Sequence, residues 1–569
     1  MRYLAVVIDY DGVLATDGRA SCAAISAIER LRMSGRRAIL NTGRRLDEIL
    51  EVFPQLAIFD RVVAENGAVA YNPRTREETL LAQPPPAEFI QRLRDLGVNP
   101  LEVGQVMVST WLPHHTTVLQ AIQEMGLELQ VIFNRAAVMI LPAGVNKATG
   151  MDYALRTLGM SPHEVVGVGD SENDHSFLER SECAVAVANA IPSIQKCAAF
   201  VTRGEQGQGV VELIDELIAD DLFRIHRRLQ QHYIPIGRRC DGTLVSVPPY
   251  GFNILIAGPS GSGKSTVAAG FVERLMKQAY QLCIIDPEGD YGTLPDVITI
   301  GNENHAVAVN EVLALLEDPK LTLNVNLLGV SLNDRPEFFG QLFPTLQAMR
   351  TRNGRPHWIV LDEAHHMLPA DWAHLDRALP HSLGETVLVT VHPDHLAPMV
   401  LALVDAVIAV GPSPRATMQT FADAIGRPLA WPDDLQYHQG RAVVWFSRRE
   451  EGPFSIEIMP GCAERLRHVR KYAEGNMRYR SFFFRGPGNR HNIKAHNLAL
   501  FTQIGDGIED ATWLFHLHRG DYSRWLRGCV KDTYLADQVE RIEQRQDLQP
   551  AETRRLIRTL IEARYTLPE

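Results

Sequence analysis

A glycine-rich loop in the middle of the chain constrains the fold more strongly than any other feature. The apolar run 254–257 leads into the sequence GPSGSGKST at 258–266, and a helical pattern covers 267–276. Glycines let successive backbone N–H groups point at phosphate oxygens, while the lysine reaches the terminal phosphates and the next serine binds Mg²⁺. This Walker A motif predicts an α/β domain that binds ATP through Gly258, Gly261, Gly263, Lys264, Ser265 and Thr266.

A second apolar run, 358–361, ends in Asp362 and Glu363. At the end of a buried strand, Asp362 is expected to hold Mg²⁺ through water and Glu363 to activate the attacking water. The alternative for Glu363 is an acid at the start of a helix, where the helix dipole favours it. A kinase that phosphorylates an alcohol needs no such glutamate, so the pair favours ATP hydrolysis.

Near the N-terminus, the apolar run 4–8 delivers Asp9 and Asp11 at the end of a predicted strand. The carboxyl ends of strands are where α/β sheets bind ligands. Two neighbouring carboxylates repel, and one takes up a proton unless a divalent cation is bound. With the cation in place, one carboxylate is free to attack phosphorus.

Three further segments add polar groups in order along the chain. They supply a hydroxyl, a lysine and an oxygen-rich cluster suited to Mg²⁺: Thr42 after the run 38–40, Lys147 after 138–141, and Asp170, Asn173 and Asp174 after 165–168. A single aspartate at a strand end is often only a helix N-cap. The ordered set of four segments favours a Mg²⁺-dependent phosphatase site.

Short apolar runs alternate with amphipathic helical patterns and divide the chain into domains. With 569 residues, the chain is too long for a single core. The alternation predicts α/β domains at 1–215 and 234–460, joined by a connector helix at 216–233. A mainly helical domain is expected at 461–569, where one helical face collects Leu556, Ile557, Leu560 and Ile561.

Composition favours a soluble globular protein. The net charge of −11 gives no general attraction to nucleic acid, although a local basic patch stays open. The seven cysteines are scattered without metal-ligand spacing, which suits a reducing compartment. The first apolar run is too short for a signal peptide, and the run 399–410, broken by Asp405, is too short for a membrane span and is expected to be a buried strand. We therefore expect a cytoplasmic protein without a membrane segment.

Residues 1–215 resemble the haloacid dehalogenase (HAD) superfamily, specifically its Cof-like and sugar-phosphatase branch. The resemblance rests on DxDG at 9–12, TGR at 42–44, ENGA at 65–68, Lys147, and GDxxND at 169–174. It implies a Rossmann-like core with a small α/β cap at about 84–144, a lid that excludes water and selects the substrate. A cap this short suits a small phosphorylated metabolite.

The same resemblance implies a role for each motif residue. Asp9 would be the nucleophile that forms an aspartyl-phosphate, and Asp11 the general acid and then base. Thr42 and Lys147 would bind the phosphoryl group. Magnesium would be held by Asp9, the Asp11 carbonyl and Asp170, with Asn173 and Asp174 in support.

Residues 234–460 resemble the HerA/FtsK superfamily of ring-forming ATPases. The resemblance rests on the Walker A motif, IIDPEGDY at 284–291, LDEAHHM at 361–367 and the lead-in Ile236-Gly237. It implies a RecA-like domain and a homo-oligomer such as a hexamer, with ATP between subunits. An arginine would come from the neighbouring subunit, and the candidates are Arg350, Arg352 and Arg415.

The chain departs from the HerA pattern in three ways. His392 stands where the family usually carries the glutamine that senses the γ-phosphate, and an imidazole also donates a hydrogen bond. The phosphatase-like region takes the place of the usual preceding β-barrel, and no nuclease partner motif is visible. The resemblance therefore supports nucleotide binding more directly than it supports ring assembly or DNA translocation.

Three weaker signals keep more than one interpretation. His365, His366, His392 and His395 match no zinc-binding spacing, so histidines satisfied at strand ends are favoured over metal ligands. The segment 465–494 mixes arginines with aromatic residues, which suits single-stranded nucleic acid or, preferably, a strap with packed aromatics. The segment 516–525 is suited to binding and carries no evident reaction.

Taken together, these features predict a bifunctional Mg²⁺-dependent hydrolase, a phosphomonoesterase coupled to an oligomeric ATPase. The alternative is a nucleic-acid machine, either a HerA-type translocase or an end-processing phosphatase in repair or phage defence. A third interpretation makes the helical C-terminal domain a docking module for a protein partner.

Overall fold

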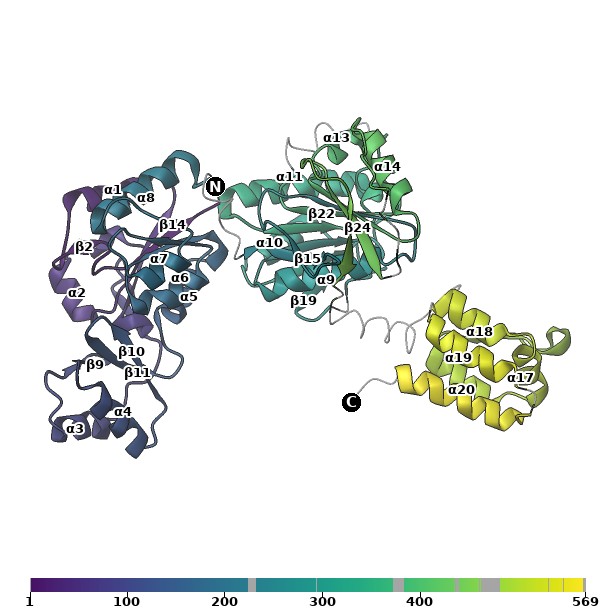
Figure 1. The fold of residues 1–569 in the computed structure, drawn as a ribbon, viewed down its shortest axis with the longest axis horizontal. Helices are drawn as coiled ribbons and strands as arrows, with labels where there is room; N and C mark the ends of the chain where they lie inside the picture. Colours follow the sequence, from purple (N-terminus) through teal and green to yellow (C-terminus); the bar gives the residue numbers. More distant parts are fainter. Residues whose placement is uncertain are drawn as a thin grey trace. The chain divides into compact units, whose positions relative to one another are not determined.

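A computed structural model describes residues 2–223, 232–292, 294–371, 383–433, 435, 438, 440–459, 461, 481–530, 532–545 and 547–565 (Figure 1). These residues form two compact units. The first comprises Met1–Ser262, Leu275–Gly289 and Ile298–Glu457, and the second Gly263–Arg274, Asp290–Val297 and Ile458–Glu569. The predicted connector helix 216–233 is described only at 216–223 and 232–233, where residues 216–220 form the end of α8 and Asp221 is its left-handed C-cap. Residues 465–480 of the basic segment, including Arg478 and Arg480, lie outside the described residues.

The N-terminal sheet has eight strands in the order β14-β13-β12-β1-β4-β5-β6-β7. The pairs from β14 to β5 are parallel, and β6 and β7 add an antiparallel edge. The strands span Ala5–Ile8 (β1), Arg37–Asn41 (β4), Arg61–Ala64 (β5), Val69–Asn72 (β6), Glu77–Leu80 (β7), Val165–Gly169 (β12), Cys183–Ala186 (β13) and Phe200–Val201 (β14). Because β1 is central, its carboxyl end meets those of β4 and β12.

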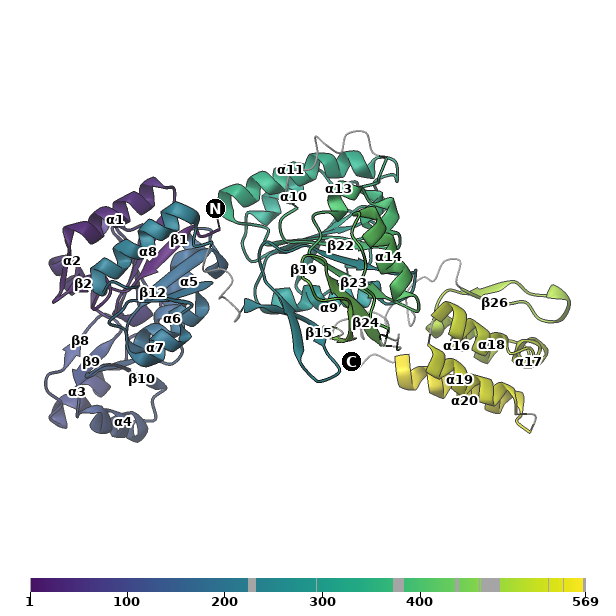
Figure 2. The same cartoon turned by 45° about the horizontal axis from the view of Figure 1, so that its top comes forward.

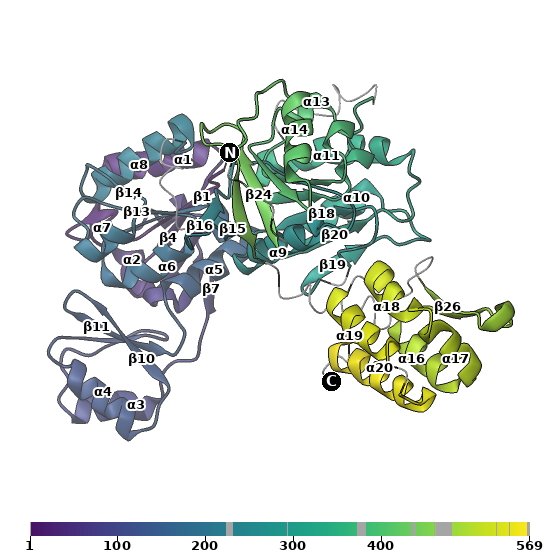
Figure 3. The same cartoon turned by 45° about the vertical axis from the view of Figure 1, so that its right-hand side comes forward.

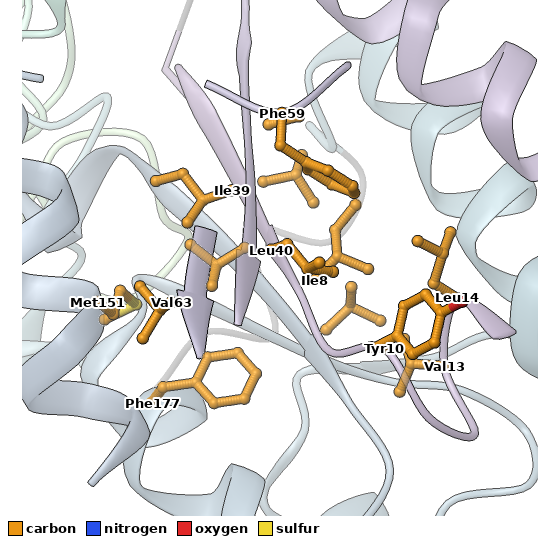
Figure 4. Close-up of a cluster of buried hydrophobic side chains, with 14 of the residues drawn as sticks. Ile8, Tyr10, Val13, Leu14, Ile39, Leu40, Phe59, Val63, Met151 and Phe177 are labelled. Atoms are coloured by element: carbon orange, nitrogen blue, oxygen red, sulfur yellow. The ribbon is translucent and has the colours of Figure 1, made fainter. Parts of the chain in front are cut away.

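Helices cover both faces of this sheet, which explains why the central strands β1, β12 and β13 are apolar and fully buried. The helices are α1 (Cys22–Met33), α2 (Leu46–Val52), α5 (Lys147–Thr157), α6 (His175–Arg180), α7 (Pro192–Cys197) and α8 (Gln206–Asp220). Figure 2 shows α1 beside α8 on one face and α5, α6 and α7 on the other. In Figure 4, Val63 of β5 lies beside Met151 of α5, and both are fully buried.

A small cap is inserted between β7 and α5. Its antiparallel sheet has the order β10-β11-β9-β8, and Figure 3 shows α3 and α4 on one side of it. The elements are α3 (Ala87–Asp95), β8 (Glu102–Val103), β9 (Val108–Trp111), α4 (His115–Glu124), β10 (Leu129–Asn134) and β11 (Ala137–Pro142). The cap has its own apolar cluster around Phe89, Val118 and Ile140.

The second sheet has eleven strands in the order β16-β15-β25-β24-β23-β17-β22-β21-β18-β20-β19. Described pairs from β23 to β20 are parallel, whereas β24 pairs antiparallel with both β23 and β25. The strands span Ile234–Arg238 (β15), Leu244–Val247 (β16), Ile254–Ala257 (β17), Leu282–Asp286 (β18), Val297–Ile300 (β19), Thr322–Asn326 (β20), Trp358–Leu361 (β21), Thr386–Thr390 (β22), Ala406–Val410 (β23), Arg441–Phe446 (β24) and Phe454–Ile458 (β25). The main helices are α9 (Lys264–Lys277), α10 (Val309–Leu316), α11 (Arg335–Asn353) and α14 (Pro414–Ala424).

The sequence pattern predicted a single strand for the apolar run 399–410. The structure shows a helix and a strand there instead. The first part of the run belongs to the short helix α13 (Pro398–Leu401), and only its second part forms β23. Proline at the first helical position is pre-organised for a helix, which explains the start of α13. Asp405 separates the two elements and accepts a hydrogen bond from the Asn253 backbone at 2.8 Å. None of the described helices is both long and apolar enough to cross a membrane.

The C-terminal part is mainly helical, with a hairpin of β26 (Phe482–Phe484) and β27 (Ile493–Ala495) beside the bundle (Figure 2). The helices are α16 (Leu498–Gly507), α17 (Asp510–Leu517), α18 (Asp521–Trp525), α19 (Thr533–Glu543) and α20 (Pro550–Tyr565). Their core is aromatic and includes Trp513 and Tyr522. The predicted apolar face of the last helix is present, because Ile557 and Ile561 are buried in that core.

Candidate active sites

A buried lysine lies between two aspartates at the carboxyl end of the N-terminal sheet. Asp9 follows β1, and Asn146 caps α5 so that Lys147 is its first residue. The Lys147 Nζ atom lies 2.5 Å from Asp9 Oδ1 and 2.6 Å from Asp174 Oδ1. All three side chains are buried, and the two carboxylates offset the cost of burying the ammonium group.

Burial and charge act in opposite directions in this cluster. Burial by itself would lower the pKa of Lys147, but the carboxylates of Asp174 and Asp9 outweigh it, and the net shift is upward. For Asp9, burial raises the pKa well above its usual range, and the charge of Asp174 adds to this while Lys147 opposes it. A further positive charge at this site would favour the ionised form of Asp9.

The carboxylates of the site fit a divalent cation. Ligand oxygens of Asp9, Asp170 and Asp174 all lie within 4.8 Å of one another. Burial also raises the pKa of Asp170, which a bound cation would reverse. A Cβ on Gly12 would lie 2.4 Å from Asp170 Oδ2 and its φ is +78°, so only glycine leaves the carboxylate in place. Hard oxygen donors of this kind suit Mg²⁺.

Asp174 and Asn173 have other partners in this arrangement. One oxygen of Asp174 accepts from Lys147, and the other accepts from the backbone N–H groups of Asp170 and Ser171 at 2.8 and 3.0 Å. The Asn173 amide donates to Asn66 Oδ1 at 3.0 Å. Asp174 therefore holds the lysine and the loop in place.

Asp11 and Thr42 lie at the same carboxyl end of the sheet as Asp9. Asp11 is 42% exposed and forms a bidentate pair with Arg44, with both N–O distances at 2.7 Å. This pairing raises the pKa of Arg44. Ile8 pairs with Leu40, so Asp9 and Thr42 follow neighbouring strand ends, and Thr42 Oγ1 accepts from the Arg44 backbone at 3.1 Å.

Comparison with known proteins identifies this part of the chain. A family model described as haloacid dehalogenase-like hydrolase matches residues 6–99 and 130–214. The phosphoglycolate phosphatase of Methanothermobacter thermautotrophicus is 30% identical over 219 residues, covering 37% of this chain and 96% of that protein. The chain belongs to the haloacid dehalogenase-like hydrolases. The stretch between the two matched ranges falls within the cap.

Other relatives of this HAD domain agree in extent. The phosphoglycolate phosphatase of Pyrobaculum aerophilum is 31% identical over 222 residues, covering 38% of this chain and 95% of that protein. A solved haloacid dehalogenase-like hydrolase from Bacteroides thetaiotaomicron is 19% identical, with a TM-score of 0.34, over 38% of this chain and 99% of that one.

A second family model, described as the central domain of the helicase HerA, matches residues 253–341.

The loop after β17 has the backbone of a phosphate-binding loop. Gly258 has a φ of +154°, and a Cβ there would lie 2.1 Å from the Val410 carbonyl oxygen. Gly261 and Gly263 also have positive φ values, of 76° and 101°. Helix α9 begins at Lys264 and includes Ser265 and Thr266. The HAD domain is thus followed by the strand, loop and helix that the sequence predicts.

Asp362 and Glu363 follow β21, which is two strands away from β17. The Asp362 side chain is buried, and its backbone N–H donates to the Ile285 carbonyl at 3.1 Å. Glu363 has a φ of 43°, a strained left-handed conformation for a residue with a side chain. Its carboxylate lies 3.5 Å from His365 Nδ1, which also contacts Thr390 Oγ1 at 3.0 Å.

His392 follows β22, between β17 and β21, and is exposed. Its ring stacks on that of His395 with centroids 4.5 Å apart. Ligand atoms of His392, Asp394 and His395 lie within 4.8 Å of one another, whereas His365 contacts Thr390 instead. The four histidine rings lie close together, because the His365 ring contacts those of His366, His392 and His395. Of the four, His392 and His395 share the described group of possible metal ligands, and the structure adds Asp394 to it.

The three arginine candidates differ in their surroundings. Arg350 is buried, and its guanidinium donates to five backbone carbonyls: those of Pro356, Leu383, Gly384, His357 and Glu385. These hydrogen bonds hold the Arg350 side chain inside its own domain, so it is not available to a neighbouring subunit. Arg352 pairs with Glu317, and Arg415 is exposed with its guanidinium carbon 6.0 Å from the Trp431 ring centre.

Two functional contacts were not predicted from the sequence. The buried carboxylate of Glu65 accepts hydrogen bonds from the backbone N–H groups of Gln105, Val106 and Met107, each at 2.8 Å. Arg135, at the tip of the cap hairpin, places Nη2 2.6 Å from Asp170 Oδ2. Glu65 belongs to the ENGA motif, but a partner about 40 residues away leaves no local signal.

Proposed function

We propose that the N-terminal domain is a Mg²⁺-dependent phosphomonoesterase that acts on a small phosphorylated acid, with phosphoglycolate as the first candidate. The observation that carries the proposal is the buried cluster of Asp9, Lys147 and Asp174 beside Asp170. Relatives named phosphoglycolate phosphatase match this domain over nearly their whole length, which supports the substrate class.

In this proposal, one oxygen of Asp9 attacks phosphorus, and the bond from phosphorus to the substrate oxygen breaks. Asp11 gives its proton to the leaving oxygen and then takes one from the water that attacks the aspartyl-phosphate. That second attack releases inorganic phosphate and restores Asp9. Lys147 and Thr42 bind the phosphoryl oxygens. Mg²⁺, held by Asp9, Asp170 and the Asp11 carbonyl, would neutralise the charge that develops on them.

Phosphate release from phosphoglycolate tests this function. Asp9→Asn keeps the size of the side chain but removes the nucleophile, so the rate should fall by at least about 10³-fold. Lys264→Ala, in the other domain, should leave the rate with Mg²⁺ unchanged in the absence of ATP. An Asp9→Asn variant that keeps the wild-type rate would refute the assignment.

We further propose that the second domain hydrolyses ATP as a homo-oligomer. Lys264 would contact the β- and γ-phosphates, Ser265 and Asp362 would hold Mg²⁺, and Glu363 would activate water. The left-handed backbone of Glu363 supports a functional role for this residue. Glu363→Gln should bind ATP normally yet lose at least about 10²-fold in hydrolysis, whereas Lys264→Ala should lose binding itself.

A buried contact between Glu164 and Arg355, within the first compact unit, supports coupling between the two activities. Glu164 directly precedes β12, which leads to Asp170, and Arg355 lies shortly before β21, which leads to Asp362. The Arg355 Nε atom lies 3.1 Å from Glu164 Oε1, and each side chain is only 2% exposed. We propose that nucleotide binding changes phosphatase activity through these strands.

The coupling is tested by measuring phosphatase rates with no nucleotide, with ADP and with a non-hydrolysable ATP analogue. We expect the analogue to change the rate by at least about two-fold, and Lys264→Ala to abolish the response. Identical rates together with an identical oligomeric mass would refute the coupling.

The HerA match keeps a nucleic-acid translocase as the second candidate. Arg527, Arg545, Arg554 and Arg558 pair with acidic side chains and give it little support. Arg485 and Lys494 lie instead over the Phe483 ring, as a nucleic-acid-binding segment would arrange them. An ATPase rate that rises with single- or double-stranded DNA would favour the translocase, and an unchanged rate would favour the proposed hydrolase.

A further inference from the structure

Arg135 occupies a backbone position that seldom carries a long side chain. It lies in the two-residue turn between β10 and β11, where Asn134 pairs with Ala137. Its φ is 52°, in the left-handed region, where hairpin turns of this length favour asparagine or glycine. The presence of arginine at this strained position directs attention to its side chain.

The guanidinium of Arg135 reaches from the cap to the phosphatase site. Its Nη2 atom lies 2.6 Å from Asp170 Oδ2, and its backbone N–H donates to Glu172 Oε2 at 3.1 Å. Asp170 is buried, whereas the Arg135 side chain is 60% exposed. The guanidinium therefore has donors free to bind an additional anion.

Arg44, the other guanidinium at this site, is already engaged at all three nitrogen atoms, and its side chain is only 22% exposed. Its Nε and Nη2 atoms bind Asp11, and its Nη1 atom binds Glu48. Lys147 is fully buried and is occupied by two carboxylates. Among the described residues that contact the site, Arg135 is thus the exposed cation.

The cap holds the Arg135 side chain close to the loop at 42–44, which is proposed to bind the phosphoryl group. Glu65 of the core binds three successive backbone N–H groups of the cap, which fixes the segment that leads into β9. On β11, Met139 Cε would lie only 3.2 Å from a Cβ on Gly43, and Met139 is buried. The cap therefore brings the apolar Met139 side chain against the loop at 42–44 and the Arg135 guanidinium against Asp170.

We propose that Arg135 determines substrate specificity by binding a carboxylate at the end of the substrate away from the phosphoryl group. A cation bound by Asp170 would compete with the guanidinium for the same oxygen and repel it, which frees Arg135 for the substrate. A planar guanidinium matches a carboxylate with two parallel hydrogen bonds. The inference rests on the proposed phosphatase function, and it restricts the substrate to a short phosphorylated acid.

The test compares 2-phosphoglycolate with ethyl phosphate, which has the same two-carbon skeleton without the carboxylate. In Arg135→Ala, kcat/KM for phosphoglycolate should fall by about 10²-fold, mainly through KM, while ethyl phosphate changes by less than about two-fold. Arg135→Lys should recover part of the loss. Arg92→Ala is the matched control, because Arg92 pairs with Glu124 on the cap surface.

Two results would overturn the inference: equal losses for both substrates, or no loss for either. Calorimetric binding of each compound to Asp9→Asn with Mg²⁺, with and without Arg135→Ala, gives a readout that needs no turnover. There, only phosphoglycolate should lose affinity. If the wild type releases phosphate from neither compound, the phosphatase proposal fails, and the calorimetry still decides the role of Arg135.

Discussion

At the residue scale, the phosphatase site depends on a charge balance that no single side chain maintains. Lys147 has no exposed surface and is enclosed by Asp9 and Asp174. Because its pKa in the folded state is raised above that of free lysine, its stabilising effect is fully present below pH about 10 and is lost only as the pH rises through the higher folded value. The Lys147 ammonium group therefore stays charged across the physiological range.

Lys147→Met tests this balance, because methionine is similar in length but leaves buried carboxylates without their cation. We expect the free energy of unfolding to fall by roughly 3–5 kcal/mol, as measured by chemical denaturation, with complete loss of phosphatase activity. Adding Asp174→Asn should recover part of the stability, since it removes one unpaired charge. Lys196→Met, at an exposed position on α7, serves as the control, and equal effects of the two lysine changes would contradict the argument.

At the element scale, the cap is anchored to the core by a backbone segment rather than by side chains alone. The residues that Glu65 binds connect β8 to β9, and Val106 and Met107 are buried in the core of the phosphatase domain. A carboxylate that accepts three N–H groups is suited to this task, because it has only acceptor sites. The cap elements are thereby fixed beside the loop at 42–44, which is proposed to bind phosphate.

Glu65→Gln should loosen that anchor, because the amide has one acceptor oxygen and its NH₂ group opposes a backbone N–H. We expect a loss of about 2–3 kcal/mol in local stability, seen as faster hydrogen exchange of the amides at 105–107, and a fall in kcat of about ten-fold. Glu78→Gln is the control, since Glu78 accepts only from the exposed Gln105 side chain. Unchanged exchange at these amides would refute the anchoring role.

At the scale of the whole molecule, the first compact unit contains both α/β sheets, and a buried acid lies where they meet through Glu164 and Arg355. Burial raises the pKa of Glu164 to about 8, although Arg355 opposes the shift. Burial also holds the pKa of the neighbouring His357 well below its usual range, so that ring is neutral. Arg355 is thus the charged partner that Glu164 meets when it ionises.

This shift predicts a pH-dependent stability. The folded state keeps the Glu164 proton between pH about 4.5 and 8 while the unfolded state releases it, so the stabilising effect is full below that window and declines as pH rises through it. Glu164→Gln should remove on the order of 3 kcal/mol of that decline, measured by thermal unfolding from pH 5 to 8. Glu179→Gln, with a carboxylate 65% exposed, should keep the wild-type slope, and parallel slopes in all three proteins would contradict the prediction.

Much of the fold followed from local patterns. Apolar runs of four or five residues predicted β1, β12, β17 and β21, because a strand buried on both faces must be largely apolar. The prediction for the run 399–410 was wrong, because a short buried helix and a short buried strand have the same apolar sequence pattern. The family of the phosphatase domain was also readable, since its motifs lie directly after strands.

The sequence by itself determined which residues end the strands and carry phosphate chemistry, because strand ends, glycine turns and helix starts depend on neighbours in the chain. Only the tertiary structure decided how Lys147 is shared between Asp9 and Asp174, that Arg350 is internal, and that Arg135 and Glu65 join the cap to the core. These contacts span up to 138 residues between Asp9 and Lys147, and they depend on strand order and on the insertion of the cap. Local sequence patterns do not encode such distances.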